Sequence, residues 1–127
     1  MMATISKDFT FSASHQLGSL PHGHQCARLH GHNYIIRVGI EGEVDHRGFV
    51  VDYGDLAGFG RYVDRSLDHR HLNEVVDQPT AERIAYHLVG ILRKEVTPLC
   101  SNGHHPLAIS IAVSETPKTW ATITEKW

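Results

Sequence analysis

Histidine and cysteine side chains gather in one short stretch of the chain, CARLHGH at residues 26–32. His30 and His32 are two residues apart, so in a β-strand both imidazoles project from one face, with Cα atoms roughly 6 to 7 Å apart. One metal ion can bridge that distance. In a chain with 11 histidines, the alternative is a pair of solvated imidazoles in a loop. Cys26 has basic neighbours, which favour the thiolate, the reactive form of cysteine.

Two alternating patterns are expected to position these imidazoles. Odd positions from 5 to 15 are mostly apolar and even positions mostly polar, which predicts a half-buried strand that ends at His15. Residues 30–40 show the same alternation, and the histidine pair lies on the apolar face. The intervening residues 18–25 contain Pro and Gly, which indicate a loop. Antiparallel pairing of the two strands would bring His15 beside the pair.

Three converging imidazoles predict a metal centre. Structural zinc sites close all four positions with Cys and His, so three His without a fourth protein ligand are typical of a catalytic Zn²⁺ site. We therefore predict that His15, His30 and His32 bind Zn²⁺. For His15, at the end of an apolar strand face, a histidine buried in the core is the alternative.

The rest of the chain predicts two helices and two further strands, which gives the order ββααββ and an α+β domain with a four-stranded antiparallel sheet. The expected elements are a strand end at 48–51, a helix that begins at Asp52 and carries apolar residues at helical spacing to Leu67, a helix from 80 to 98 with Thr80 as N-cap, and strands at 107–113 and 120–127.

Length and composition are those of one soluble domain covering residues 1–127. The net charge of -2, with acidic and basic residues interspersed, marks no nucleic-acid face and no polybasic membrane patch. The chain contains no signal-peptide core and no run of about 18 apolar residues, so we expect a cytoplasmic protein. In a reducing compartment, Cys26 and Cys100 are expected to stay free thiols.

Three other groups are candidates for chemistry. Asp68-His69 is a possible acid/base pair, because a carboxylate can fix the tautomer of a neighbouring imidazole. The alternative is a charge pair at a helix end. Glu115 lies on an apolar strand face, where a carboxylate needs a partner. That partner is either a structural Arg or a ligand with two parallel N–H donors. The histidines of the polar loop 101–106 are expected to be solvated.

Five segments together resemble the 6-pyruvoyl-tetrahydropterin synthase superfamily over nearly the whole chain: FSASHQL, CARLHGHNY, LDHRHLN, PTAE and VSETP. The resemblance is greatest to the 6-carboxytetrahydropterin synthase branch. Three residues separate Cys26 from His30. The corresponding motif of the pyruvoyl-forming enzymes is longer, Cys-x5-His-Gly-His.

The resemblance implies roles for individual residues. His15, His30 and His32 would hold Zn²⁺, and Cys26 would accept a proton. Asp68 and His69 would form a relay. Glu115 would anchor the pterin and count among the catalytic residues, with Thr80 in the substrate site.

The resemblance also implies a fold, an assembly and a reaction. The fold would be the tunnelling fold, with two helices on one face of the sheet and subunits joined into a barrel, as a trimer or a dimer of trimers. The enzyme would be a lyase that converts 7,8-dihydroneopterin triphosphate to 6-carboxy-5,6,7,8-tetrahydropterin, acetaldehyde and triphosphate, in queuosine (7-deazaguanine) biosynthesis.

Three alternatives remain open from the sequence. The first is a 6-pyruvoyl-tetrahydropterin synthase, which eliminates triphosphate on the same scaffold. The second is a three-His zinc hydrolase, which leaves Cys26 and Glu115 without a role. The third is a non-catalytic module that binds zinc or pterin.

Overall fold

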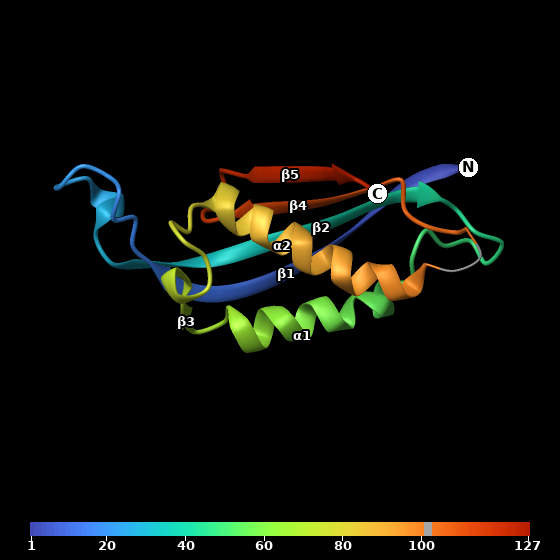
Figure 1. The fold of residues 1–127 in the computed structure, drawn as a ribbon, viewed down its shortest axis with the longest axis horizontal. Coiled ribbons are helices and arrows are strands. Elements are labelled where there is room, and N and C mark those ends of the chain that lie inside the picture. The colour runs from blue at the N-terminus through green and yellow to red at the C-terminus, as the bar shows by residue number, and fades with distance from the viewer. Residues whose placement is uncertain (101–102) are drawn as a thin grey trace.

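The centre of the molecule is a pair of long strands, seen in a computed structural model that describes residues 1–100 and 103–127. Strand β1 (Met2–His15) pairs antiparallel with β2 (His30–Glu43) over the full length of both (Figure 1). The alternating pattern predicted both strands, and the structure extends them beyond the predicted ends. The segment 16–29 between them projects beyond the end of the sheet, away from the rest of the molecule.

Three further strands complete a five-stranded sheet in the order β3-β1-β2-β4-β5. Strand β4 (Ala108–Ser114) pairs antiparallel with β2, and β5 (Ala121–Lys126) pairs antiparallel with β4. The prediction of four strands missed β3 (Arg70–His71), which runs parallel to β1. This short strand forms because the chain beside it is bonded to Ser12, whose carbonyl accepts from the amide of His69 at 2.7 Å.

Both predicted helices are present. The α-helical part of the first begins later than expected, whereas the second begins at its predicted N-cap. A 3₁₀ turn at Tyr53–Leu56, capped by the Asp52 carboxylate, precedes α1 (Ala57–Ser66). Helix α2 (Ala81–Val96) begins after Thr80, whose hydroxyl accepts from the amide of Arg83 as predicted for an N-cap. A 3₁₀ turn at Thr97–Leu99 follows, in which Pro98 interrupts the α-helical pattern as expected.

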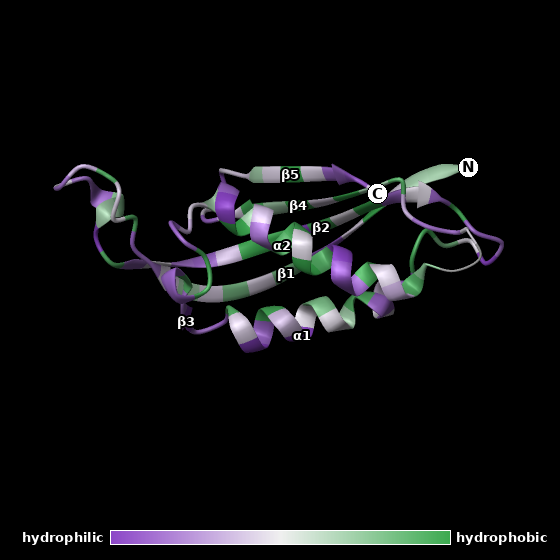
Figure 2. Ribbon diagram, in the orientation of Figure 1, coloured by the Kyte–Doolittle hydropathy of each residue, from purple (hydrophilic) through white to green (hydrophobic). Residues whose placement is uncertain are grey.

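The two helices cover one face of the sheet, and the core lies between these layers (Figure 1). Figure 2 shows hydrophobic and hydrophilic residues alternating along the elements, as expected when only one face of each is buried. The largest fully buried side chains come from both layers: Tyr34, Phe59, Ile36, Ile40, Leu56, Leu67, Leu72, Ile84, Leu88, Leu92, Ile109 and Ile111.

The predicted strand end at 48–51 is wrong, because a side chain closes this segment into a turn. The Asp45 carboxylate accepts from the amides of Arg47 and Phe49 and pairs with the Arg47 guanidinium. The bond from the Phe49 amide and the pairing with Arg47 lower the pKa of Asp45 to about 2. Val50 is nevertheless buried and contributes to the core.

The loop before β4 matches the expectation of solvated histidines at His105, which is exposed, but not at His104. His104 is half-buried and its Nε2 donates to the carbonyl of Val50, while Nδ1 of His105 donates to that of Pro106. Ser101 and Asn102, which belong to the same predicted loop, lie outside the described residues. Within the described ranges, no helix is both long enough and apolar enough to cross a membrane.

Candidate metal centre and active site

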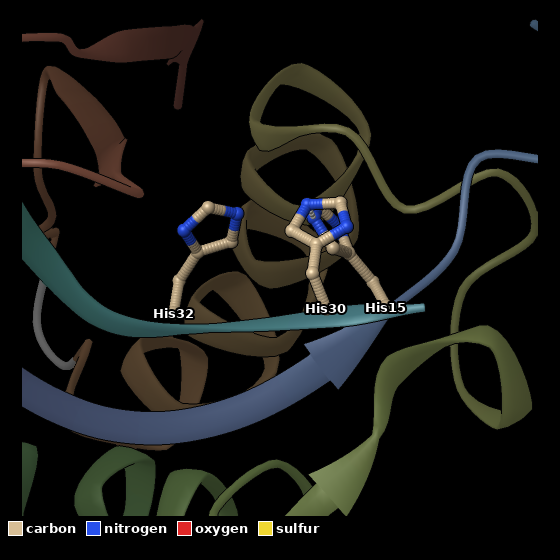
Figure 3. A group of neighbouring side chains, drawn as sticks. All are labelled: His15, His30 and His32. Carbon is tan, nitrogen blue, oxygen red and sulfur yellow. Dashed lines mark hydrogen bonds between the residues drawn. The ribbon is translucent and has the colours of Figure 1, made fainter. Parts of the chain in front are cut away.

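The β1–β2 register brings three imidazoles together at one end of the sheet. His15 lies opposite His30, and Ala13 lies opposite His32. One ring nitrogen from each histidine lies within 4.8 Å of the other two. Figure 3 shows the three rings on the same side of the paired strands. The predicted convergence of His15, His30 and His32 is therefore confirmed, although their function as ligands remains a prediction.

Backbone carbonyls determine which nitrogen of two rings is available to a metal. Nδ1 of His15 donates to the carbonyl of Pro79 at 2.8 Å, and Nδ1 of His30 donates to that of Arg28 at 2.7 Å. In the neutral rings, both Nε2 atoms then carry lone pairs, yet they face each other at 2.9 Å. Two lone pairs at that distance repel unless a cation lies between them, and ligand histidines are commonly held in this way through the other nitrogen.

His32 supplies the third free nitrogen. Its Nε2 is buried and has no hydrogen-bond partner among the described residues. A buried polar atom normally has a partner, so this nitrogen indicates a missing ligand. Burial lowers the pKa of His32, an effect opposed by Glu115 and reinforced by His15 and His30. The ring is thus kept neutral, which is the form that binds a metal. All three residues fit a metal ion.

Glu115 follows β4 and lies beside the His32 end of the centre. Its Oε2 is 3.8 Å from Nε2 of His32. The Glu115 side chain borders two hollows: one of about 680 Å³, which His32 and Asp68 also line, and one of about 250 Å³, which Thr80 also lines. Among the described residues Glu115 has no Arg partner within 4 Å. That observation argues against the structural alternative for Glu115.

Asp68 and His69 form the predicted pair. Oδ2 of Asp68 lies 3.0 Å from Nδ1 of His69, and its Oδ1 accepts from the amide of Ser12 at 2.9 Å. The bond from Ser12, followed by the contact with His69, lowers the pKa of Asp68 and keeps the carboxylate charged. His69 has a left-handed backbone, with φ of 58°, and its exposed ring lines a hollow of about 540 Å³ with His32.

The structure places Cys26 in a 3₁₀ turn (Gln25–Ala27) of the projecting segment 16–29. Its amide donates to Nδ1 of His24, and its carbonyl accepts from the amide of Leu17 at 3.1 Å. The cluster of potential metal-binding atoms contains only the three histidines among the described residues, so the Cys26 thiol lies outside it. Its catalytic role remains a prediction. Cys26 and Cys100 are both free, as expected, and burial raises the pKa of the Cys100 thiol.

Two residues that no sequence pattern singled out hold the candidate ligands in place. Tyr34, fully buried and stacked on Phe11, places its hydroxyl 3.3 Å from Nδ1 of His15. Burial raises the pKa of Tyr34, so the hydroxyl stays protonated. The side chain of Asn73 accepts from the amide of Gln16 at 2.9 Å and donates to its carbonyl at 2.7 Å. Asn73 ends the LDHRHLN segment, which was the only sequence signal for it.

The two hydrogen bonds of the Asn73 side chain extend the β1–β3 pairing to Gln16 and fix the backbone next to His15. We expect Asn73→Ala to lower the free energy of unfolding by about 1 to 2 kcal/mol. Zinc affinity should fall by about tenfold, the lower end of the range for residues that orient ligands. Asn73→Asp keeps only the acceptor for the Gln16 amide. Its free energy of unfolding and its zinc affinity should lie between those of wild type and Asn73→Ala. Urea denaturation and zinc titration measure these effects, and wild-type zinc affinity in Asn73→Ala would contradict this role.

The fold and the three histidines define an α+β domain with a candidate metal centre on one face of its two central strands. A family model described as 6-pyruvoyl tetrahydropterin synthase matches residues 4–126. The chain therefore belongs to the 6-pyruvoyl tetrahydropterin synthase family.

Relatives with similar sequences carry two activities in their names. A protein of Archaeoglobus fulgidus, provisionally named 6-carboxy-5,6,7,8-tetrahydropterin synthase, is 36% identical over 68% of this chain and 72% of its own length. The 6-carboxy-5,6,7,8-tetrahydropterin synthase of Rickettsia bellii is 26% identical over 96% of this chain and all of its own. The dihydroneopterin monophosphate aldolase of Pyrococcus furiosus is 34% identical over 76% of this chain and 80% of its own.

Solved structures show the same fold. The 6-pyruvoyl tetrahydropterin synthase of Caenorhabditis elegans has a TM-score of 0.77 and 28% identity, with 99% of this chain and 97% of that one covered. A Wolinella succinogenes protein has a TM-score of 0.81 and 23% identity, with 99% of each chain covered. The chain has the tunnelling fold predicted from its sequence, with β3 as the addition noted above.

Proposed function

We propose that the chain is a zinc-dependent 6-carboxy-5,6,7,8-tetrahydropterin synthase. It would convert 7,8-dihydroneopterin triphosphate and water to 6-carboxy-5,6,7,8-tetrahydropterin, acetaldehyde and triphosphate, in the cytoplasm and on the route to queuosine. The observation that carries the proposal is the convergence of three imidazoles, two of which have Nδ1 bonded to a backbone carbonyl and Nε2 left for a metal. The names of the relatives support the choice of reaction.

The residues around the centre suit proton transfer at carbons that bear hydroxyl groups. When bound, Zn²⁺ would act as a Lewis acid toward a substrate hydroxyl. Glu115 would accept two N–H donors of the pterin edge, which holds the ring at the His32 end. Cys26 would take a proton from the side chain, and His69, oriented by Asp68, would handle a proton on the other face.

A second candidate activity is an aldol cleavage of the same side chain, favoured by the 34% identity to the Pyrococcus furiosus aldolase. Cleavage of this kind leaves a hydroxymethyl group on the pterin and releases a two-carbon aldehyde. A 6-pyruvoyl-tetrahydropterin synthase, which keeps all three side-chain carbons, is the third possibility. A non-catalytic zinc or pterin module would release no product at all.

Product analysis separates these reactions. Purified, zinc-loaded protein is incubated with 7,8-dihydroneopterin triphosphate, and the products are identified by mass spectrometry with a trap for aldehydes. We expect 6-carboxy-5,6,7,8-tetrahydropterin and acetaldehyde in equal amounts. A hydroxymethyl pterin or a pyruvoyl pterin would replace the proposed reaction with one of the alternatives, and unchanged substrate would exclude all three.

The sheet has two open edges, which supports assembly of the chain into a homo-oligomer. Strand β3 pairs only with Ala13 and Ser14 of β1, so the outer edge of β1 before these residues is unpaired among the described residues. At the other edge, β5 pairs only with β4 within the same described ranges. Edge strands with unpaired amides and carbonyls are templates for pairing with another chain. We propose that three copies join these edges into a barrel and that two such trimers stack.

Glu115→Gln tests the pterin anchor. A glutamine amide presents an N–H group where the pterin edge also presents N–H donors, so one attractive contact becomes repulsive. We expect the Michaelis constant to rise by about 10- to 100-fold, with zinc content and melting temperature close to wild type. Glu41→Gln is the matched control, because Glu41 lies in the same sheet, near the end of β2 that is far from His30 and His32. An unchanged Michaelis constant in Glu115→Gln would remove this residue from the substrate site.

A further inference from the structure

The metal centre has two chemically different ends. Glu115 lies at the His32 end, with its Oε2 3.8 Å from Nε2 of that ring. The His30 end is linked instead to the projecting segment 16–29, because Nδ1 of His30 donates to the carbonyl of Arg28 at 2.7 Å. A substrate with its pterin ring at Glu115 and its side chain at the histidines would therefore direct its phosphate chain toward segment 16–29.

Segment 16–29 encloses a hollow of about 430 Å³. Arg28 and His22 line it, and no Asp or Glu does. Arg28 has no carboxylate partner within 4 Å among the described residues, which is also true of Arg61, Arg65 and Arg70 but not of the other four arginines. The hollow thus offers a guanidinium and an imidazole without a neutralising charge. Guanidinium groups bind phosphate oxygens bidentately, which suits a polyphosphate.

Hydrogen bonds within the segment hold the hollow in place. The amide of Leu17 donates to the carbonyl of Cys26 at 3.1 Å, which closes the base of the segment. The amide of His24 donates to the carbonyl of Pro21 at 2.9 Å. The Gln78 amide side chain donates to the hydroxyl of Ser19 and ties the segment to the residues before α2. Gly23, which also lines the hollow, is exposed, so the hollow is open to solvent.

We propose that the hollow of segment 16–29 binds the triphosphate of the substrate, with Arg28 as the principal counter-charge and His22 as a second donor. The proposal rests on the proposed function for the identity of the substrate. It adds that the two ends of the site are opposite in charge, carboxylate at Glu115 and guanidinium at Arg28, so the substrate binds in one direction. Selection of a triphosphate over a shorter phosphate chain would depend on this hollow.

The test separates the two ends of the site with two ligands, inorganic tripolyphosphate and neopterin. Binding of each to zinc-loaded wild type, Arg28→Gln and the control Arg61→Gln is measured by calorimetry, with zinc content determined afterwards because tripolyphosphate chelates metals. Arg61 lies exposed on α1. Arg28→Gln should weaken tripolyphosphate binding by about 10- to 100-fold and leave neopterin binding unchanged. His22→Gln should show a smaller loss of the same kind, and Arg61→Gln should match wild type for both ligands.

Equal tripolyphosphate affinity in wild type and Arg28→Gln would overturn the proposal, as would a parallel loss of neopterin binding. Failure of the proposed function gives a different result, since the binding measurements do not depend on turnover. A wild-type protein that binds tripolyphosphate through Arg28 but forms none of the expected products would keep the hollow as an anion site and reject the lyase. With an active enzyme, Arg28→Gln should raise the Michaelis constant for the triphosphate substrate by the same factor.

Discussion

Replacement of His30 by alanine should weaken zinc binding by at least about a hundredfold and reduce turnover to background. Even the loss of a residue that only orients a metal ligand lowers metal affinity by about 10- to 100-fold. The loss of a ligand itself should lower zinc affinity further. His30 also contributes one of the two Nε2 atoms that face each other at 2.9 Å. Removing it leaves two imidazoles, which do not retain a metal in a site built for three.

The matched control is His46→Ala, because His46 is an exposed histidine outside the ligand cluster. Metal content after extensive dialysis, together with zinc titration against a competing chelator, measures the loss. The fold should persist, since His30 lies at the end of β2 and the core is formed by other side chains. Full zinc content in His30→Ala would remove this residue from the metal centre.

Cys26→Ala is expected to lower turnover by roughly a hundredfold to ten-thousandfold, the scale for loss of a general base. Segment 16–29 carries Cys26 four residues before His30, the first residue of β2. Zinc binding should be unchanged, because the thiol lies outside the cluster of ligand atoms.

Solvent deuterium distinguishes a base from a residue that acts on binding. Wild type in D₂O should exchange a proton of the substrate side chain, and Cys26→Ala should lose this exchange while its affinity for neopterin is retained. Cys100→Ala serves as control, since this second free thiol donates to the Val96 carbonyl at the end of α2 and lies outside the cluster of ligand atoms. Exchange at the wild-type rate in Cys26→Ala would show that another group takes the proton.

Periodicity predicted the part of the site that depends on strand geometry. The alternation of apolar and polar residues set His15, His30 and His32 on one face, and the structure places His15 opposite His30. Helix caps were equally local signals, as Thr80 shows. Features of this kind follow from the chain over a few residues, and a sequence reveals them without knowledge of the tertiary structure.

Features that depend on contacts between distant segments were not predictable in this way. Besides contacting His69, the Asp68 carboxylate accepts from the amide of Ser12, 56 residues away and next to the point where β3 pairs with β1. The carbonyl of Pro79 selects the tautomer of His15 from 64 residues away. Turn formation by Asp45 replaced the strand expected at 48–51, because a side-chain carboxylate took the amides that a strand would have used.

Anomalous X-ray diffraction at the zinc absorption edge, on crystals of the protein grown with zinc, tests the metal centre most directly. We predict one strong peak per chain, about 2.0 to 2.1 Å from the Nε2 atoms of His15, His30 and His32. The open coordination position should face the hollow that His32 and Glu115 both line. Nδ1 of His15 should remain bonded to the carbonyl of Pro79, and Nδ1 of His30 to that of Arg28. No peak among the three rings, or a metal held through Nδ1, would contradict this prediction.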